Sequence, residues 1–288
     1  MSMCGCSAQG ASPSLENVRV VSNDRIAEGV GLLIFEAPRT AHHVAPGQFV
    51  HVRIARGTDF ILRRPFSVYR AHGDHLEILY QVVGRGTREM AHALPGTQMD
   101  LIGPLGCGWR ISETIAHALL VSGGLGAAPL GMLAEELARR GVAVTVAMGA
   151  PCGERLVGRD LFERVARRVE IATDDGSCGA PGLVTGVCRD LICAGGFDAI
   201  YTCGPEPMQR IVASLAAEAG VSCQVSLERL MACGIGACLS CVVDTRCGLS
   251  RVCVDGPVFY ATDVVWETAN SDEGPSGAHG RGGNGGER

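Results

Sequence analysis

The sequence predicts an antiparallel β-barrel, then an α/β domain with a parallel sheet, and then a small cysteine-rich module. Residues 15–112 contain six short β-rich runs separated by Gly, Pro, Asp and Asn, which is typical of a small barrel. Strands alternate with helices over residues 113–222, which indicates a parallel sheet that binds its ligand at the strand carboxyl ends. Four cysteines mark the third unit, residues 223–267. The segments 1–14 and 268–288 have the composition of a disordered leader and tail.

The composition excludes several classes of protein. The formal charge of −5 provides no basic face for nucleic acid or an anionic membrane. The longest apolar runs, such as HALLVSGGLGAAPLGML, are interrupted by glycine and fall short of a membrane span. The N-terminus lacks the charged start and apolar core of a signal peptide. We therefore expect a cytoplasmic protein that binds neither nucleic acid nor membrane.

Two stretches of the predicted barrel carry residues suited to a phosphorylated, aromatic ligand. In LRRPFSVYR, Arg64 has the charge to bind a diphosphate, Pro65 stiffens the chain, and Ser67 offers a hydroxyl to a heteroaromatic ring. In YQVVGRGTREMA, Gly84 and Gly86 are expected to open a turn and Thr87 to begin a helix, whose first N–H groups suit phosphate. A purely structural Arg-Pro at a strand edge and an ordinary capped turn remain the alternatives.

Two glycine turns of the α/β domain are expected to face each other across the sheet. In VSGGLGAAPL, three glycines follow a strand and precede a helix. The second turn, TCGPEPM, also joins a strand to a helix, and the two turns together would border a nicotinamide pocket. The stretch AMGAPCGERL, after the next strand, offers only Glu154 and Arg155 to a ribose or its phosphate, so the motifs leave NAD and NADP open. The residues of these turns are Gly123, Gly124, Gly126, Cys203, Gly204, Pro205 and Met208.

The C-terminal cysteines have the spacing of an iron–sulfur loop. The pattern C-x4-C-x2-C-x11-C begins with the spacing of plant-type [2Fe–2S] ferredoxins, although its fourth cysteine arrives sooner. Gly234 and Gly236 can take positive φ and turn N–H groups toward the sulfurs. Structural zinc is the alternative, but zinc sites usually pair their cysteines in C-x2–4-C knuckles. The expected ligands are Cys233, Cys238, Cys241 and Cys253.

The order of these motifs resembles the electron-transfer subunits of class 1B dihydroorotate dehydrogenases, which belong to the ferredoxin-reductase superfamily. The likeness covers roughly residues 15–267. It rests on RRPFSV, VVGRGT, GPLGCGW, VSGGLGAAPL, ATDDGSCGAPGLVT and YTCGPEPM, and above all on SLERLMACGIGACLSCVV and RVCVDGPVF. The leader and the Gly-rich tail depart from the family pattern.

The resemblance implies three cofactors. NAD would lie over the sheet at the two glycine turns, and a [2Fe–2S] cluster would bind the four cysteines. FAD would occupy the barrel, with Ser67 near the reactive flavin nitrogen and Phe66 helping to wall the ring. The residues implied around FAD are Arg64, Pro65, Phe66, Ser67, Tyr80, Gln81, Val82, Gly86 and Thr87.

The resemblance also implies a mechanism and a partner. A catalytic subunit oxidises dihydroorotate on its own FMN, electrons cross singly to the cluster and collect on FAD, and they leave as hydride to NAD⁺. The expected assembly is a heterotetramer with two copies of each subunit, acting in pyrimidine biosynthesis. No side chain has to act as a nucleophile or general base. Asp174 and Asp175 in ATDDGS would either touch the nucleotide or shape a turn.

Three other functions fit part of the sequence. The small subunit of NADH-dependent ferredoxin:NADP oxidoreductase, also described as sulfide dehydrogenase, shares this architecture and differs in its partner. A stand-alone reductase for a soluble carrier would need no partner subunit. A non-catalytic assembly subunit, with a structural zinc ion bound to the cysteines, would leave the flavin and nucleotide motifs unused and would be colourless.

Overall fold

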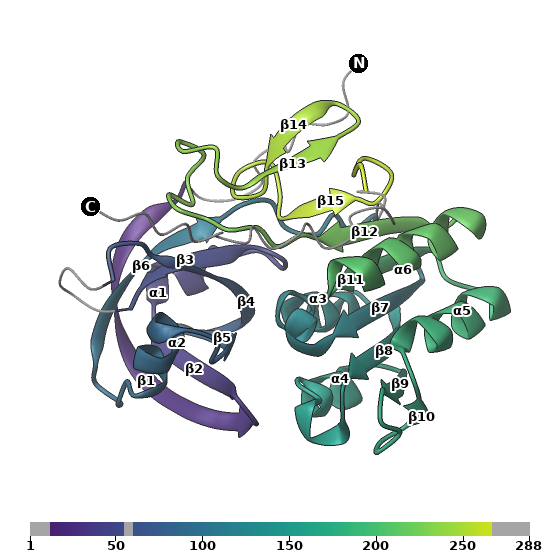
Figure 1. Ribbon diagram of the computed structural model, residues 1–288, viewed down its shortest axis with the longest axis horizontal. Helices are drawn as coiled ribbons and strands as arrows, with labels where there is room; N and C mark the ends of the chain where they lie inside the picture. The colour runs from purple at the N-terminus through teal and green to yellow at the C-terminus, as the bar shows by residue number, and fades with distance from the viewer. Residues whose placement is uncertain (1–11, 55–59, 267–288) are drawn as a thin grey trace, which may run out of the picture.

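The computed structural model describes residues 12–54 and 60–266, and the strands of its N-terminal part form a closed antiparallel barrel (Figure 1). The hydrogen-bonded order is β1-β2-β5-β4-β3-β6, and β6 closes the barrel by pairing with β1. Two short helices, α1 (Pro38–Ala41) and α2 (Arg85–Ala91), lie between strands. The barrel strands are β1 (Ser14–Ala27), β2 (Val30–Glu36), β3 (Phe49–Arg53), β4 (Arg64–His72), β5 (His75–Gln81) and β6 (Gln98–Leu105).

The barrel forms because its strands alternate apolar and polar residues. Val18 and Val20 of β1 and Leu33 and Phe35 of β2 are fully or almost fully buried, while their neighbours along the chain are more exposed. This period of two directs one face of each strand into the barrel core.

The second domain is a parallel sheet covered by helices on both faces (Figure 1). Its first part comprises β7 (His117–Gly123), η1 (Gly124–Gly126), α3 (Ala127–Arg139), β8 (Ala143–Ala150), η2 (Gly153–Arg155) and α4 (Arg159–Val165). Its second part comprises β9 (Arg168–Thr173), β10 (Ala180–Pro181), α5 (Val184–Ala194), β11 (Ala199–Cys203), α6 (Glu206–Glu218) and β12 (Ser222–Ser226). The central strands read as continuous apolar runs because both faces of the sheet are covered.

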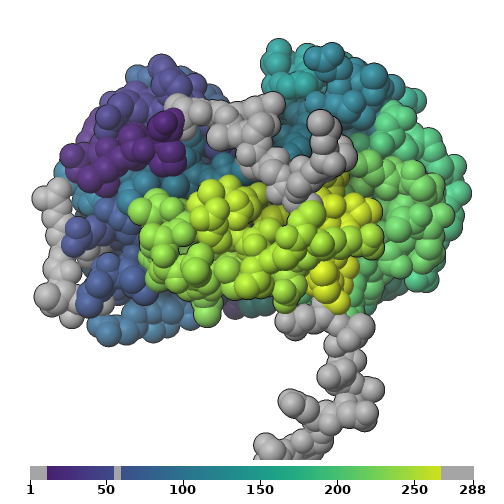
Figure 2. All heavy atoms as spheres, turned by 90° about the horizontal axis from the view of Figure 1, so that it is seen from above, coloured from purple at the N-terminus to yellow at the C-terminus, as the bar shows by residue number. Residues whose placement is uncertain are grey.

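The C-terminal segment extends this sheet and contains a hairpin. In the described part of the chain the sheet has seven strands in the order β10-β9-β8-β7-β11-β12-β15, and only β15 (Val258–Tyr260) runs antiparallel to its neighbour. The hairpin pairs β13 (Val242–Thr245) with β14 (Gly248–Arg251). Figure 2 shows the C-terminal segment lying across both the barrel and the α/β domain.

Direct packing joins the barrel to the α/β domain. Gly131 of α3 stands so close to β4 that an added Cβ would lie 2.6 Å from the Tyr69 ring. Val30 and Leu79 of the barrel share a buried cluster with Ala128 and Leu161 of the second domain. Because helix α3 rests on the barrel, the first glycine turn of the sheet opens toward the barrel strands.

The predicted fold class is confirmed: an antiparallel barrel, a parallel α/β sheet and a cysteine-bearing C-terminal segment follow one another. The proposed boundary between residues 222 and 223 falls at the start of β12, which runs from Ser222 to Ser226. The predicted disorder of the leader and tail falls almost wholly outside the described residues, and β1 begins at Ser14. No helix of the described residues is long and apolar enough to cross a membrane.

Candidate functional site

Two cavities meet between the barrel and the sheet. The first, here the barrel cavity, has a volume of about 500 Å³ and is lined mainly by β4, the end of β5 and α2. The second, the sheet cavity, has a volume of about 600 Å³ and lies at the carboxyl ends of the sheet strands. Both cavities are lined by Gln81, Leu125, Leu227, Glu228 and Arg229. Ligands in the two cavities would therefore meet at these shared residues.

The barrel cavity brings together most of the residues that the sequence assigned to FAD. Val82 does not line this cavity; it is half-buried and packs against the barrel core instead. The predicted residues in the lining are Arg64, Pro65, Phe66, Ser67, Tyr80, Gln81, Gly86 and Thr87.

The two predicted phosphate-binding stretches converge at one wall of the barrel cavity. A Cβ on Gly86 would lie 3.2 Å from Arg64 Nε and 3.1 Å from Ile54 Cδ1, so a larger residue here would push these side chains aside by a few tenths of an ångström. Arg64 also donates a hydrogen bond to the Leu62 carbonyl, which orients the guanidinium. Arg85, which the sequence analysis did not single out, adds a second cation to this wall. The wall therefore has the charge and the open backbone that a diphosphate needs.

The hydroxyl groups around the barrel cavity differ in the hydrogen bonds that they already make within the protein. The Tyr80 hydroxyl donates to Asn23 Oδ1 over 2.8 Å, and burial raises its pKa. The Thr87 hydroxyl accepts hydrogen bonds from the N–H groups of Val83 (2.9 Å) and Gly84 (3.1 Å), so it caps its own turn. Within the described residues the Ser67 hydroxyl has no hydrogen-bond partner and lines the cavity. Ser67 is therefore the hydroxyl free to bind a ligand.

The two glycine turns pack against each other, as the sequence predicts. A Cβ on Gly126 would lie 2.0 Å from the Cys203 carbonyl oxygen, and one on Gly123 would lie 2.7 Å from Met208 Sδ. Cys203, which the sequence analysis placed at the pocket, does not line the sheet cavity: its thiol is buried, burial raises its pKa, and its carbonyl packs against Gly126. The predicted residues that line the sheet cavity are Gly123, Gly124, Gly126, Gly204, Pro205 and Met208.

The far part of the sheet cavity carries charged side chains whose roles the sequence left open. Arg155, after β8, lies 3.7 Å from the carboxylate of Glu28, which belongs to the β1–β2 turn of the barrel. Asp174 lines the cavity and has no side-chain partner among the described residues, whereas Asp175 accepts hydrogen bonds from Ser177 N–H and Oγ. Asp175 therefore shapes the turn, and Asp174 faces the ligand space.

Glu228 and Arg229, at the junction of the two cavities, were missed by sequence reasoning. Glu228 faces both cavities, and desolvation by the surrounding protein raises its pKa. Arg229 pairs with Glu206 at 2.8 Å. Both residues come from the segment after β12, more than 100 residues from the motifs of the barrel; they belong to the stretch SLERLMACGIGACLSCVV, of which the sequence analysis singled out only the cysteines and glycines.

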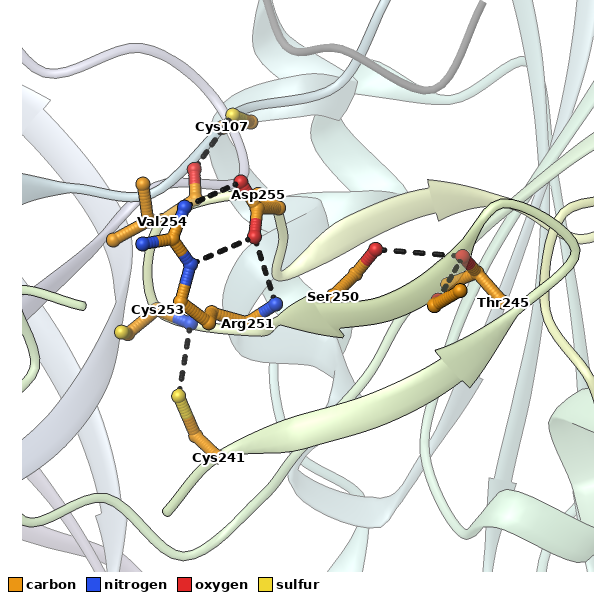
Figure 3. Close-up of polar contacts among 9 residues, drawn as sticks. Cys107, Cys241, Thr245, Ser250, Arg251, Cys253, Val254 and Asp255 are labelled. Carbon is orange, nitrogen blue, oxygen red and sulfur yellow. Dashed lines mark hydrogen bonds and ion pairs between the residues drawn. The ribbon is translucent and has the colours of Figure 1, made fainter. Parts of the chain in front are cut away.

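The four cysteines lie in a loop that begins two residues after Met231, a residue of the barrel-cavity wall. In this cysteine loop, residues 233–253, the thiols approach each other in pairs. The Cys238 N–H donates to Cys233 Sγ over 3.4 Å, and the Cys253 N–H donates to Cys241 Sγ over 3.4 Å (Figure 3 shows the second pair). Among the described residues no three His, Cys, Asp or Glu side chains gather at metal-binding distance.

The backbone of the cysteine loop suits an anionic sulfur-ligated group. Gly234 and Gly236 take the positive φ values of 70° and 83° that the sequence predicts for a curled loop. The pKa of the Cys238 thiol is lowered to about 6. The hydrogen bond from the Ser240 hydroxyl is the largest cause, and hydrogen bonds from N–H groups of the loop lower the pKa further. Burial and the neighbouring Cys241 raise the pKa of Cys253 to about 12. Soft thiolate donors with N–H groups directed at sulfur fit an iron–sulfur cluster.

An ion pair fixes the end of the cysteine loop. Arg251 contacts Asp255 through Nε–Oδ2 at 3.0 Å and Nη2–Oδ1 at 3.2 Å, and the Arg251 N–H also donates to Oδ2 (Figure 3). Because Cys253 lies between these two residues, the pair holds the turn that presents its thiol. The Cys107 N–H donates to the Gly256 carbonyl over 2.6 Å and joins this turn to the barrel.

Comparisons with known proteins match the cysteine-bearing segment and nearly the whole chain. Residues 228–265 match the family described as the iron-sulfur cluster binding domain of dihydroorotate dehydrogenase B. The chain is 37% identical over 257 residues to the dihydroorotate dehydrogenase B (NAD(+)) electron transfer subunit of Desulforamulus reducens, covering 87% of this chain and 98% of that one. It is 40% identical over 252 residues to the same subunit of Caldanaerobacter subterraneus, covering 86% and 97%.

Solved structures share the architecture. A structure of NADH-dependent reduced ferredoxin-NADP oxidoreductase aligns with a TM-score of 0.79 and 31% identity, covering 86% of this chain and 90% of that one. A ferredoxin NADP⁺ reductase from Neisseria gonorrhoeae with bound FAD and NADP aligns with a TM-score of 0.61 and 16% identity, covering 72% and 92%, which shows the shared fold. With a ferredoxin-reductase fold, an iron–sulfur domain and close similarity along nearly the whole length of its relatives, the chain belongs to the family of dihydroorotate dehydrogenase B electron transfer subunits.

Proposed function

We propose that this chain carries electrons from a dihydroorotate-oxidising catalytic subunit, through a [2Fe–2S] cluster and FAD, to NAD⁺. The observation that carries the proposal is the placement of the barrel cavity. It shares five lining residues with the sheet cavity, and Met231 in its wall lies two residues before the first cysteine of the cysteine loop. A flavin in the barrel cavity would therefore stand between a nicotinamide and the cluster.

The residues of the barrel cavity bind and orient FAD. Arg64 and Arg85 would supply the charge for the diphosphate, and the Ser67 hydroxyl, which lines the same cavity, would be available to hydrogen-bond the isoalloxazine. Phe66 and Tyr80, whose rings meet edge-on at 6.5 Å, wall the ring system. Bound FAD supplies the exchange between one-electron and two-electron chemistry that a cluster and NAD⁺ cannot make directly.

The sheet cavity positions NAD(H). The glycine turns at Gly123–Gly126 and Gly204–Pro205 let the dinucleotide approach the backbone at the sheet edge. The shared residues Gln81 and Glu228 lie where the nicotinamide would meet the flavin. The chain supplies placement and exclusion of water, and none of its side chains has to act as a nucleophile.

The cysteine loop holds the cluster and faces a partner. Cys233, Cys238, Cys241 and Cys253 are the proposed ligands. Cys238 is exposed, and so are the neighbouring side chains of Ile235 and Leu239. This exposure supports docking of a catalytic, FMN-containing subunit over the loop, in a cytoplasmic heterotetramer with two copies of each chain.

The similarity to an NADH-dependent ferredoxin-NADP oxidoreductase supports a second candidate function. That structure aligns over most of both chains with 31% identity. In this alternative the cofactor sites are unchanged, and the cysteine loop meets a different flavoprotein. The two candidates therefore differ only in the partner that supplies or receives electrons.

Reconstitution with a partner tests the proposal. The purified full chain, loaded with FAD and cluster, is mixed with a class 1B catalytic subunit, and NADH formation is followed after dihydroorotate is added. We expect NADH only when both chains are present, and light scattering should give the mass of two copies of each. Failure to form a complex, with electron transfer instead to a ferredoxin-NADP oxidoreductase large subunit, would assign the second candidate.

A further inference from the structure

His51 of β3 (Phe49–Arg53) is a fully buried histidine that the proposed electron path does not yet explain. Its side chain has no solvent exposure, and neither ring nitrogen has a hydrogen-bond partner within the described residues. Buried polar groups are nearly always paired, because leaving one unpaired costs the desolvation of that group. The backbone carbonyls of Cys233 and Arg63 lie near the ring but complete no hydrogen bond of good geometry with it, so a small adjustment of either segment would pair a ring nitrogen.

The ring lies against the cysteine loop. A Cβ on Gly234 would stand 2.4 Å from His51 Nδ1 and 3.1 Å from Cε1, so this edge of the imidazole faces the segment between the first two cysteines. Burial lowers the pKa of His51, although the nearby carbonyls of Cys233 and Arg63 oppose that shift. A neutral imidazole has one N–H donor and one acceptor nitrogen.

The same residue also touches the strand that lines the barrel cavity. In the β3–β4 ladder His51 is opposite Pro65, and its neighbours Val50 and Phe49 are opposite Phe66 and Ser67. Pro65, Phe66 and Ser67 all line the barrel cavity. His51 thus joins the wall of the proposed flavin site to the loop of the proposed cluster.

We propose that His51 is a positioning residue for the cluster: its ring N–H is the donor that hydrogen-bonds the cysteine loop at Cys233–Gly234 when the cluster is bound. This inference rests on the proposed function, since it needs a cluster in the loop. A hydrogen bond donated to the Cys233 carbonyl holds the ligand-bearing turn in place and so slows the loss of iron. The bond also fixes the loop against the strand that carries the flavin.

The test compares His51→Leu, which removes the donor, with His51→Gln, which keeps an amide N–H. His51→Met is a second apolar variant whose flexible chain fills the site if leucine does not. His72→Leu, an exposed histidine at the end of β4, is the matched control. Each full chain is reconstituted with iron, sulfide and FAD. Its iron content is measured after loading and during incubation with a chelator, and the thermal stability of the cluster-free form is recorded.

We expect the apolar variants to lose iron more readily than wild type, while glutamine keeps iron retention near wild type. Their cluster-free forms should unfold no more easily than wild type, because the substitution removes two unpaired buried nitrogens. Iron retention in the apolar variants equal to that of wild type, or an iron loss that glutamine does not rescue, would overturn the inference and leave His51 a packing residue. A wild-type chain that binds no cluster would instead overturn the proposed function.

Discussion

Arg64 and Gly86 lie against each other at the wall of the barrel cavity, where a Cβ on Gly86 would stand 3.2 Å from Arg64 Nε. The two residues come from motifs more than 20 positions apart in the sequence. Arg64 lies on strand β4 and Gly86 on helix α2, and both elements border the barrel cavity. Their contact joins an arginine and an open backbone turn into one site for a diphosphate.

Replacing Arg64 with alanine should weaken FAD binding. Loss of one charge-assisted contact to phosphate costs about 1.5–3 kcal/mol, or roughly a 10- to 150-fold rise in Kd. Flavin fluorescence released on dialysis measures the effect. Arg19→Ala, which removes an exposed ion pair with Glu36 on the barrel surface, is the control and should retain FAD. Equal flavin retention in the two variants would refute the role of Arg64.

Replacing Gly126 with alanine should block the use of NADH. The new methyl group would lie 2.0 Å from the Cys203 carbonyl oxygen, which forces the two glycine turns apart. Stopped-flow reduction of the bound flavin by NADH should slow strongly while FAD content stays normal. Gly186→Ala is the control, because Gly186 lies within α5 with open space around it; that change should raise helix stability by about 1 kcal/mol. Normal reduction in Gly126→Ala would mean that NADH binds elsewhere.

Asp174 and Glu28 should set the preference for NADH over NADPH. Among the described residues the Asp174 carboxylate faces the sheet cavity without a partner, and the Glu28 carboxylate pairs with Arg155, a cation of the same cavity that could bind a 2′-phosphate. The double variant Asp174→Asn with Glu28→Gln should raise the ratio of NADPH to NADH use by about 10-fold or more, since removing a like charge near the phosphate is worth about 1–4 kcal/mol.

The control for this preference is Asp160→Asn, a carboxylate on α4 that does not line the cavity. Flavin reduction rates with each nucleotide give the ratio. A double variant that keeps the wild-type ratio would show that the adenosine ribose does not lie at this end of the cavity.

Replacing Cys238 with serine should remove the cluster and leave the flavin reducible by NADH. Cys238 is an exposed member of the cysteine loop, and the barrel and sheet cavities do not include it. Iron content and visible absorbance should fall to the flavin-only level, and electron transfer to the partner should stop. Cys193→Ser, an exposed cysteine on α5, should change neither. Full cluster absorbance in Cys238→Ser would remove it from the ligand set.

The parts of the fold and site that local patterns mark were predicted from the sequence. Alternating strands with Gly and Pro turns indicated the barrel, and strand–glycine–helix order indicated the parallel sheet. The packing of Gly126 against Cys203 follows from two turns at the carboxyl ends of neighbouring strands, β7 and β11. Such features depend on residues close in sequence or on a regular topology.

The remaining features depend on tertiary placement. Cys203 was expected at the pocket, but its thiol points into the core because alternate residues of a strand face opposite sides. Glu228 reaches the cavity junction only because β12 ends there. His51 was part of an ordinary strand pattern, and only the fold reveals its contact with Gly234. Likewise, β15 joins the sheet from a segment that the sequence marked only by its cysteines.

An anaerobic ultraviolet–visible and EPR spectrum of the purified full chain, before and after NADH, tests the central claim most directly. The account predicts flavin bands together with iron–sulfur absorbance, and a rhombic [2Fe–2S] signal that appears on reduction. A colourless chain that contains zinc would contradict it, because the cysteine loop would then hold a structural zinc ion, which cannot transfer electrons.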